Sequence, residues 1–249
     1  MARSKEADVA RLYHLHSCHV RARPVEQELG GDAVPQRFKS YPGALRTELP
    51  GRDFALEATL GAVLERRRSI RAYARRPLQL ATLGRLLHAS YGVRGRRSSG
   101  AGMGYERSAP SAGGLYPVEL YVATAGVEGL DDGVHHYDAR AHALDLVRPG
   151  AMQETLVDLT LGQDLAGSAN LVFVMTAVWD RTAYKYGQRG YRYALLDAGH
   201  LGENLYLVAT ALGLGPSGIG GFLDHELNAL LDLPAGEEAV YILCVGQPS

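Results

Sequence analysis

The chain has 249 residues, of which 46% are hydrophobic and 21% are charged. This composition can build a sizeable core and excludes a largely disordered protein. The 26 basic and 27 acidic residues give a net charge of −1, which argues against a dedicated nucleic-acid-binding protein. Cys18 and Cys244 lie at opposite ends of the sequence and match neither a disulfide framework nor a metal-binding spacing, so a reduced, cytoplasmic setting is expected.

The N-terminal part begins with helical spacing of apolar side chains over residues 6–17. It lacks the apolar run of a secretory signal, and nowhere does the chain approach the ~18 consecutive apolar residues of a membrane span. Residues 20–53 contain four prolines and little periodicity. We therefore interpret residues 1–53 as a helix and an irregular segment that wraps around a domain formed by residues 54–249.

The stretch 66–71 (RRRSIR) ends a helix predicted over residues 55–66 and places four guanidinium groups and one hydroxyl within six residues. Arginine offers a planar fork of donors that matches phosphate geometry. The stretch is therefore a candidate site for one compact dianion, such as a terminal phosphate. The alternative is a solvated basic helix end. A second helix is predicted over residues 79–91.

Residues 92–109 are dominated by Gly, Ser and Arg, which predicts a mobile loop. Such a loop can be a lid, a substrate contact or a simple excursion. The following stretch 110–117 (PSAGGLYP) is rich in small residues, which lets its backbone lie flat against a planar group; an ordinary turn is the alternative. Residues 118–125 alternate and are rich in β-branched and aromatic side chains, which indicates a buried strand.

Histidines gather in two places. His14, His16 and His19 do not share one helical face, so no zinc site is predicted there. Residues 133–138 and 142–148 are expected to form an antiparallel hairpin, and its histidines are interpreted as solvent-facing positions without a metal role: His135, His136 and His142.

The C-terminal half continues with helices and apolar strands. Residues 171–179 form a continuous apolar run, which is typical of a central strand. The helix predicted over residues 190–212 is apolar nearly all round and is expected to be buried, with Gly199 and Gly202 allowing close helix packing, for example across a subunit interface. The remaining predicted elements are helices at 151–162 and 224–231 and a strand at 239–246. Helices and strands without strict alternation favour an α+β fold.

Two further stretches carry functional hypotheses. Lys185 and Tyr186 lie in a segment dense in tyrosine and basic residues, where they are either a catalytic pair or a surface pair at a strand end. The glycine-rich turn at residues 213–222 is not a dinucleotide-binding motif, because it follows a helix and no βαβ unit surrounds it. Its backbone amides are nevertheless available to a cofactor. Together with residues 66–71 and 110–117, these stretches fit a phosphorylated planar cofactor.

Several of these stretches resemble the nitroreductase superfamily, and more closely its azoline dehydrogenases of the SagB/McbC type. The resemblance runs through most of the chain, and its most specific parts are PSAGGLYPVELYV at 110–122 and KYGQRGYRY at 185–193. It also includes LYHLHS near the start, residues 39–42, RRSIR at 67–71, GVHHYD, DAGHLGENL and IGGF at 219–222. It implies a three-layer α-β-α sandwich with a mainly antiparallel central sheet, assembled as an intertwined homodimer that binds FMN.

The resemblance also implies roles for individual residues. The FMN phosphate would be held by Arg67, Arg68, Ser69 and Arg71. The isoalloxazine ring would lie along Pro110, Ser111, Ala112, Gly113 and Gly114. The other subunit would approach the flavin with Gly220 and Gly221, and the catalytic pair would be Lys185 and Tyr186.

The implied reaction is the oxidation of a thiazoline or oxazoline ring to a thiazole or oxazole in a ribosomal peptide or a carrier-bound nonribosomal chain. Such a reaction needs a positioned base, a role that falls to Lys185, while Tyr186 relays the proton or orients the substrate. Two alternatives stay open. One is an NAD(P)H-dependent reductase of nitro, quinone or dehydroamino-acid substrates, and the other is a non-enzymatic scaffold that partners a cyclodehydratase.

Two departures from related sequences shape these expectations. The chain stops at Ser249, whereas many relatives continue into a basic tail that helps to bind the phosphate, so phosphate binding is expected to rest on residues 66–71. No leader-peptide recognition module of ~80 residues is visible, so another protein is expected to present a peptide substrate.

Overall fold

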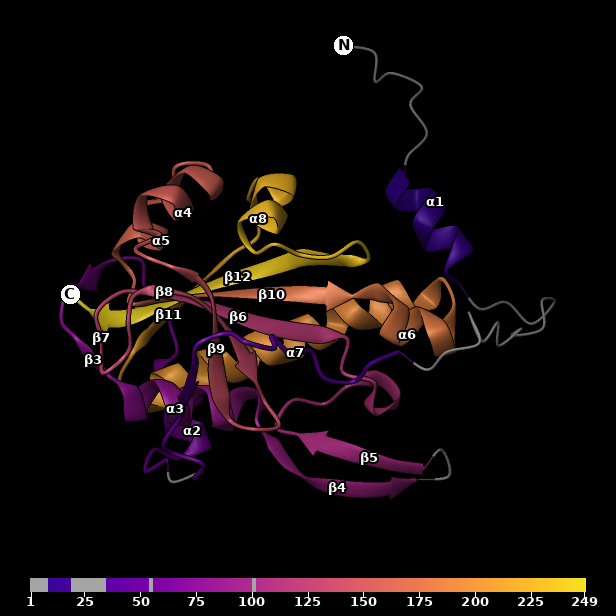
Figure 1. The fold of residues 1–249 in the computed structure, drawn as a ribbon, viewed down its shortest axis with the longest axis horizontal. Coiled ribbons are helices and arrows are strands. Elements are labelled where there is room, and N and C mark those ends of the chain that lie inside the picture. The colour runs from indigo at the N-terminus through magenta and orange to yellow at the C-terminus, as the bar shows by residue number, and fades with distance from the viewer. Residues whose placement is uncertain (1–8, 19–34, 54–55, 100–101) are drawn as a thin grey trace, which may run out of the picture.

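The computed structural model describes residues 9–18, 35–53, 56–99 and 102–249. A central sheet has the strand order β1-β9-β8-β6-β10-β12-β11, and β2 also pairs with β12. Every pairing in this sheet is antiparallel. Helices α4, α5 and α8 cover one face, and α2, α3 and α7 cover the other (Figure 1). This is the three-layer α-β-α architecture expected from the resemblance.

The sheet is formed by β1 (Arg46–Glu48), β2 (Tyr73–Ala74), β6 (Val118–Thr124), β8 (Gly133–Asp138), β9 (Ala143–Pro149), β10 (Leu171–Val178), β11 (Gly215–Ile219) and β12 (Glu237–Pro248). Two short strands pair in parallel, namely β3 (Leu78–Gln79) and β7 (Val127–Glu128). A separate antiparallel hairpin is formed by β4 (Val93–Ser99) and β5 (Gly102–Arg107). The helices are α1 (Val9–His16), α2 (Leu60–Arg66), α3 (Leu80–Tyr91), α4 (Gln153–Leu159), α5 (Asp164–Ser168), α6 (Trp179–Tyr186), α7 (Arg189–Ala211) and α8 (Asp224–Leu230), with a 3-10 turn η1 at Ala112–Gly114.

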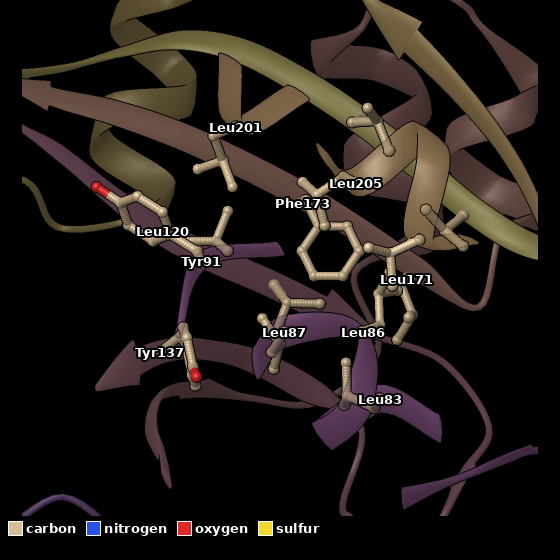
Figure 2. Close-up of a cluster of buried hydrophobic side chains, with 14 of the residues drawn as sticks. Leu83, Leu86, Leu87, Tyr91, Leu120, Tyr137, Leu171, Phe173, Leu201 and Leu205 are labelled. Carbon is tan, nitrogen blue, oxygen red and sulfur yellow. The ribbon is translucent and has the colours of Figure 1, made fainter. Parts of the chain in front are cut away.

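Two apolar cores lie on the two faces of the sheet because strand residues alternate between the faces. On β6, Leu120 and Val122 enter the core against α3 and α7, whereas Tyr121 enters the core against α4, α5 and α8. Figure 2 shows the first of these cores, where leucines of α3 and α7 meet Phe173 of β10. Strand β10 lies between β6 and β12, which confirms the central strand expected from its continuous apolar run.

Helix α7 differs from its prediction in one respect. One side is buried against the sheet, as expected, but Leu195 and Leu196 on the other side are 40% and 57% exposed. Gly202 packs against the ring of Tyr241, while nothing lies within 4 Å of the position that a Cβ on Gly199 would occupy. The helix is therefore buried on one side only within a single chain.

Several predicted loops are strands. Residues 92–109, expected to be a mobile loop, contain the β4–β5 hairpin, because backbone pairing needs no apolar pattern. Residues 215–219, expected to be part of a turn, form β11 on β12. Within the segment expected to be irregular, β1 pairs with β9. The stretch expected to be a mobile loop therefore has a regular ladder through most of its described length.

Some helix boundaries also differ. Thr59 caps the first turn of α2 by accepting a hydrogen bond from Ala62 N, so the helix begins at Leu60 and not at residue 55. The helix predicted over residues 151–162 ends at Leu159 and is followed by the separate α5. Lys185 and Tyr186 lie on a helix, α6, and not at the end of a strand. Part of the N-terminal helix prediction and residues 19–34 lie outside the described residues.

The hairpin histidines are buried, so the expectation of solvent-facing positions is wrong. Their exposed fractions are 2% for His135, 1% for His136 and 1% for His142. Each ring finds a polar partner: Asp131 O, Glu119 and Tyr137 respectively. β8 is an interior strand between β6 and β9, which explains the burial of His135 and His136, whereas His142 lies in the turn before β9 and packs against His88. The described part of the chain contains no group of three or more side chains able to hold a metal ion.

The segment before β1 contributes buried polar contacts to the sheet. Lys39 Nζ lies 2.7 Å from Glu237 Oε2 and 2.6 Å from Tyr121 Oη, and the hydroxyls of Tyr41 and Tyr121 are 2.7 Å apart. A membrane-crossing helix is not found in the described ranges, since none there has the required length and apolar character.

The packing of residues 49–50 on α3 generates a stability prediction. A Cβ on Gly84 would lie 2.0 Å from the carbonyl oxygen of Pro50, whereas nothing lies within 4 Å of a Cβ on Gly61 of α2. Gly84→Ala is expected to lower the free energy of unfolding by about 2 kcal/mol, because backbone must move. Gly61→Ala is expected to raise it by up to about 1 kcal/mol, because alanine favours helix. Urea denaturation followed by circular dichroism measures both, and equal effects would contradict the packing.

Candidate functional site

The turn at residues 110–116 is fastened to α7 through one buried carboxylate. Ser111 Oγ donates to Asp197 Oδ2 at 2.5 Å, and Ala112 N lies 3.3 Å from Asp197 Oδ1. Tyr116 N donates to Ser111 Oγ at 2.8 Å and closes the turn. Burial raises the pKa of Asp197, and the hydrogen bonds from Ser111 and Ala112 oppose that rise. The turn is thus held by side chains, while its small residues remain partly exposed.

The same turn contacts the predicted catalytic pair. Gly113 has a φ of +63°, which favours glycine. A Cβ at this position would lie 2.5 Å from Tyr186 Oη and 3.1 Å from Lys185 Nζ. The Tyr186 ring is further supported by Tyr193 of α7, with ring centroids 4.8 Å apart. The structure therefore brings the PSAGG turn and the pair Lys185 and Tyr186 together.

A buried ion pair anchors α6, the helix that carries this pair. Arg181, one helical turn before Lys185, lies 2.5 Å from Glu119 Oε1 and donates to Tyr116 O at 3.0 Å. Glu119 Oε2 lies 2.9 Å from His136 Nε2. Arg181 and Glu119 are each 4% exposed at the side chain. Arg181 therefore connects α6, β6 and the 110–116 turn at one point.

Electrostatics keep Glu119 ionised in this place. Burial alone would raise the pKa of Glu119, but the hydrogen bond with His136 and the charge of Arg181 outweigh it and lower the pKa to about 2. The sequence reasoning missed both Glu119 and Arg181. A charged residue within a strand predicted to be buried was the available signal, because such a charge requires a partner.

The arginine stretch lies at the end of α2, against β11. Ile70 N donates to Pro216 O at 2.9 Å, and Ser69 Oγ lies 3.3 Å from Tyr206 Oη of α7. Tyr206 Oη also accepts a hydrogen bond of 2.6 Å from Gly218 N, and the guanidinium of Arg67 lies 5.6 Å from the Tyr206 ring centroid. Tyr206 thus ties the arginine stretch to the glycine-rich stretch, a role that the sequence analysis did not identify.

The predicted phosphate contacts differ in exposure. Arg67 and Ser69 are half-buried, whereas Arg68 and Arg71 are exposed. Arg68 donates to the carbonyl oxygens of Glu65 and Arg67. Gly220 and Gly221 follow β11 and are also exposed, with Gly221 O accepting from Gln163 Nε2 at 3.3 Å.

The two groups of predicted residues lie on opposite flanks of α7. Asp197 holds the 110–116 turn, and Tyr206 contacts the arginine stretch. Tyr206 is the ninth residue after Asp197, which corresponds to about 13.5 Å along a helix and two and a half turns. Within one chain, therefore, the 110–116 turn lies beside Lys185 and Tyr186, whereas the arginine stretch lies beside the glycines of β11.

Comparison with known proteins identifies the family. Residues 64–247 match the model of the nitroreductase family. MJ1384 of Methanocaldococcus jannaschii, named as a nitroreductase, is 37% identical over 177 residues, which cover 71% of this chain and 86% of that protein. The chain therefore belongs to the nitroreductase family, whose members are oxidoreductases.

Other proteins are similar to this chain over part or all of its length. A solved nitroreductase structure from Anabaena variabilis covers 100% of this chain with a TM-score of 0.75 and 27% identity, and the chain spans about half (49%) of that protein. The microcin B17-processing protein McbC of Escherichia coli is 30% identical over 132 residues, which are 51% of this chain and 48% of McbC. The E. coli microcin synthetase McbBCD complex with truncated pro-MccB17 has the same fold, with a TM-score of 0.62, 22% identity, and coverage of 100% of this chain and 84% of that chain.

A double-mutant cycle tests the contact between the turn and the catalytic pair. Gly113→Ala places a methyl group against Tyr186 Oη, so Tyr186→Phe is expected to relieve part of its cost. The expected coupling in the free energy of unfolding is about 1 kcal/mol. Gly114 is the matched control, because its φ is +65° and nothing lies within 4 Å of a Cβ there. Urea denaturation of the unmodified protein, the three single variants and the two double variants measures the coupling, and equal coupling for both glycines contradicts the contact.

The buried ion pair predicts a pH dependence of stability. Because the pKa of Glu119 falls from 4.5 to about 2 on folding, its stabilisation is complete above pH 4.5 and is lost as the pH falls towards 2. At pH 7, Glu119→Gln is expected to cost about 3 to 5 kcal/mol, because Arg181 is left buried without its anion. The difference from the unmodified protein should shrink below about pH 4.5. Urea denaturation across this range measures it, with the exposed Glu226→Gln as a control; a pH-independent difference would refute the ion-pair account.

Proposed function

We propose that this protein is an FMN-dependent dehydrogenase that oxidises thiazoline or oxazoline rings to thiazoles or oxazoles in peptide natural-product biosynthesis. The contact of Gly113 with Lys185 and Tyr186 is the observation that carries this proposal. It joins the flat turn proposed for the flavin ring to a candidate base and a hydroxyl. The sequence similarity to McbC, a microcin B17-processing protein, supports the substrate class.

The side chains present fit FMN. Around residues 67–71, guanidinium groups and the hydroxyl of Ser69 provide donors suited to a terminal phosphate, with Tyr206 beside them. The turn at residues 110–114 provides a surface without bulky side chains, and no atom lies within 4 Å of a Cβ built on Gly114. We assign Arg67, Arg68, Ser69 and Arg71 to the phosphate and Pro110, Ser111, Ala112, Gly113 and Gly114 to the ring.

A homodimer completes the proposed site. The arginine stretch and the 110–116 turn lie on opposite flanks of α7, so a single copy does not direct both at one ligand. Apolar side chains are exposed on α2 and near the start of α7: Leu60 (64%), Leu64 (54%), Leu195 (40%) and Leu196 (57%). A second copy that covers this surface brings the phosphate residues of one chain to the turn of the other, with Gly220 and Gly221 in the same site.

In the proposed mechanism, Lys185 and Tyr186 act on the substrate ring. When bound, FMN supplies the two-electron acceptor that takes the hydride. Lys185 Nζ, held half-buried near Gly113, takes the proton from a ring carbon of the substrate. The Tyr186 hydroxyl orients the heterocycle. Arg181 and Glu119 hold α6 in place, so that the base remains at the edge of the turn.

A second function is favoured by one observation. MJ1384, to which the chain is similar over 71% of its length, is named as a nitroreductase. The same flavin site can serve an NAD(P)H-dependent reductase of nitro, quinone or dehydroamino-acid substrates. Such a reductase needs no lysine that abstracts a proton.

For the dehydrogenase, we propose a cyclodehydratase as partner, because McbC is found in the McbBCD complex.

Replacement of Lys185 separates the two functions. The purified protein is loaded with FMN, its flavin absorbance is recorded, and a thiazoline peptide is added anaerobically. The unmodified protein should bleach, whereas Lys185→Ala should keep its flavin absorbance and bleach at least about 100-fold more slowly, since the base is lost. Gln188→Ala, an exposed change just after α6, is the control.

Three outcomes decide against the dehydrogenase. If the purified protein does not take up FMN, the proposed reaction has no electron acceptor. Equal bleaching rates for the unmodified protein and Lys185→Ala would show that Lys185 is not the required base. Absence of bleaching by thiazoline, together with NAD(P)H-driven nitro reduction that survives Lys185→Ala, supports the reductase instead.

A further inference from the structure

A polar cavity lies at the base of the β4–β5 hairpin. Its volume is about 310 Å³, and its walls come from the segment before α2, from α3, from both hairpin strands and from the β8–β9 turn. Six of its lining residues carry basic side chains: Arg52, His88, Arg94, Arg96, Arg140 and His142. None of the residues in the proposed flavin or catalytic sets lines this cavity.

The cavity concentrates positive charge. Four of its lining residues are arginines, and no acidic residue is among the described residues that line it. The guanidinium groups are supported by backbone and by rings. Arg52 donates to Ala141 O, Arg96 lies 5.8 Å from the ring of Tyr105, and Arg140 lies 6.0 Å from the ring of Phe38. Planar forks of donors held around a small volume match phosphate oxygens.

A further buried cation lies near the cavity. Arg107, at the end of β5, is 6% exposed and lies 4.5 Å from the ring of Tyr91 and 5.1 Å from that of Phe38, which Arg140 also contacts. Aromatic faces stabilise this guanidinium, and among described residues its Nε has no hydrogen-bond partner. Arg107 therefore adds to the positive potential behind the cavity wall.

The two cavity histidines are held in fixed positions. Their ring centroids are 5.2 Å apart, and His142 adopts a left-handed backbone with a φ of +58°. His142 Nδ1 lies 2.9 Å from Tyr137 Oη. Burial lowers the pKa of both histidines and Arg52 lowers it further, while Asp53 acts against this for His88 and Glu48 for His142. Both imidazoles are thus fixed in place, and the positive charge of the cavity comes from its four arginines.

We propose that this cavity binds a compact polyphosphate anion, either free pyrophosphate or the diphosphate group of a nucleotide. Its volume suits a small anion and not a folded macromolecule. The site is connected to the 110–116 turn, because Arg107 N donates to Tyr116 Oη at 3.0 Å. Strand β5 therefore runs from the cavity, which Tyr105 lines, to the turn that contacts Lys185 and Tyr186. The binding proposal itself does not depend on the proposed dehydrogenase function.

Isothermal titration calorimetry tests the site on the full chain preloaded with FMN, so that a flavin-phosphate site is filled before pyrophosphate is added. The double variant Arg96→Ala with Arg140→Ala removes two exposed cavity arginines. We expect its Kd for pyrophosphate to rise at least tenfold. Arg148→Ala is the control, because Arg148 is exposed, donates to Leu230 O and does not line the cavity.

The outcomes separate this site from the flavin site. Equal flavin content in all variants, with weaker pyrophosphate binding only in the double variant, supports the proposal. Parallel titration with ADP then tells whether the diphosphate is taken free or as part of a nucleotide. Absence of saturable binding, equal binding by the double variant, or displacement of pyrophosphate by excess FMN would overturn the proposal.

Discussion

The buried pair of Glu119 and Arg181 is the interaction on which the candidate site depends. It joins the central strand β6 to α6, and through Tyr116 O it reaches the turn that meets Lys185. Desolvating both charges is costly, so the pair is retained only because each ion has further polar partners. His136 supplies one of these on the sheet side. The ion pair therefore holds α6 against β6 and against the turn, while Asp197 fastens the same turn to α7.

Helix α7 organises the rest of the site. Its buried side packs on the sheet, one flank holds the 110–116 turn through Asp197, and the other contacts the arginine stretch through Tyr206. One rigid element thus fixes the spacing between the two groups of residues proposed for FMN.

The sequence predicts well where periodicity and burial coincide. The apolar run of β10 and the long repeat of α7 identified the middle of the fold, and the PSAGG turn was located by its small residues. The β4–β5 hairpin and β11 were missed, because Gly, Ser and Arg form ladders through backbone groups that leave no apolar pattern. Asp197, Tyr206 and Arg181 were not assigned roles, since their importance comes from contacts between residues distant in sequence.

The contact of Lys39 with Glu237 has a consequence for the N-terminal segment. Glu237 is 3% exposed at the side chain and also accepts from Thr176, so it remains deep in the sheet whatever happens to Lys39. Detaching the segment would leave a carboxylate inside the protein without its cation. Residues 35–53 are thus a structural part of the sandwich. A shortened protein that begins at residue 64, where the family match starts, would lack Lys39 and would keep the buried carboxylate of Glu237 without its cation.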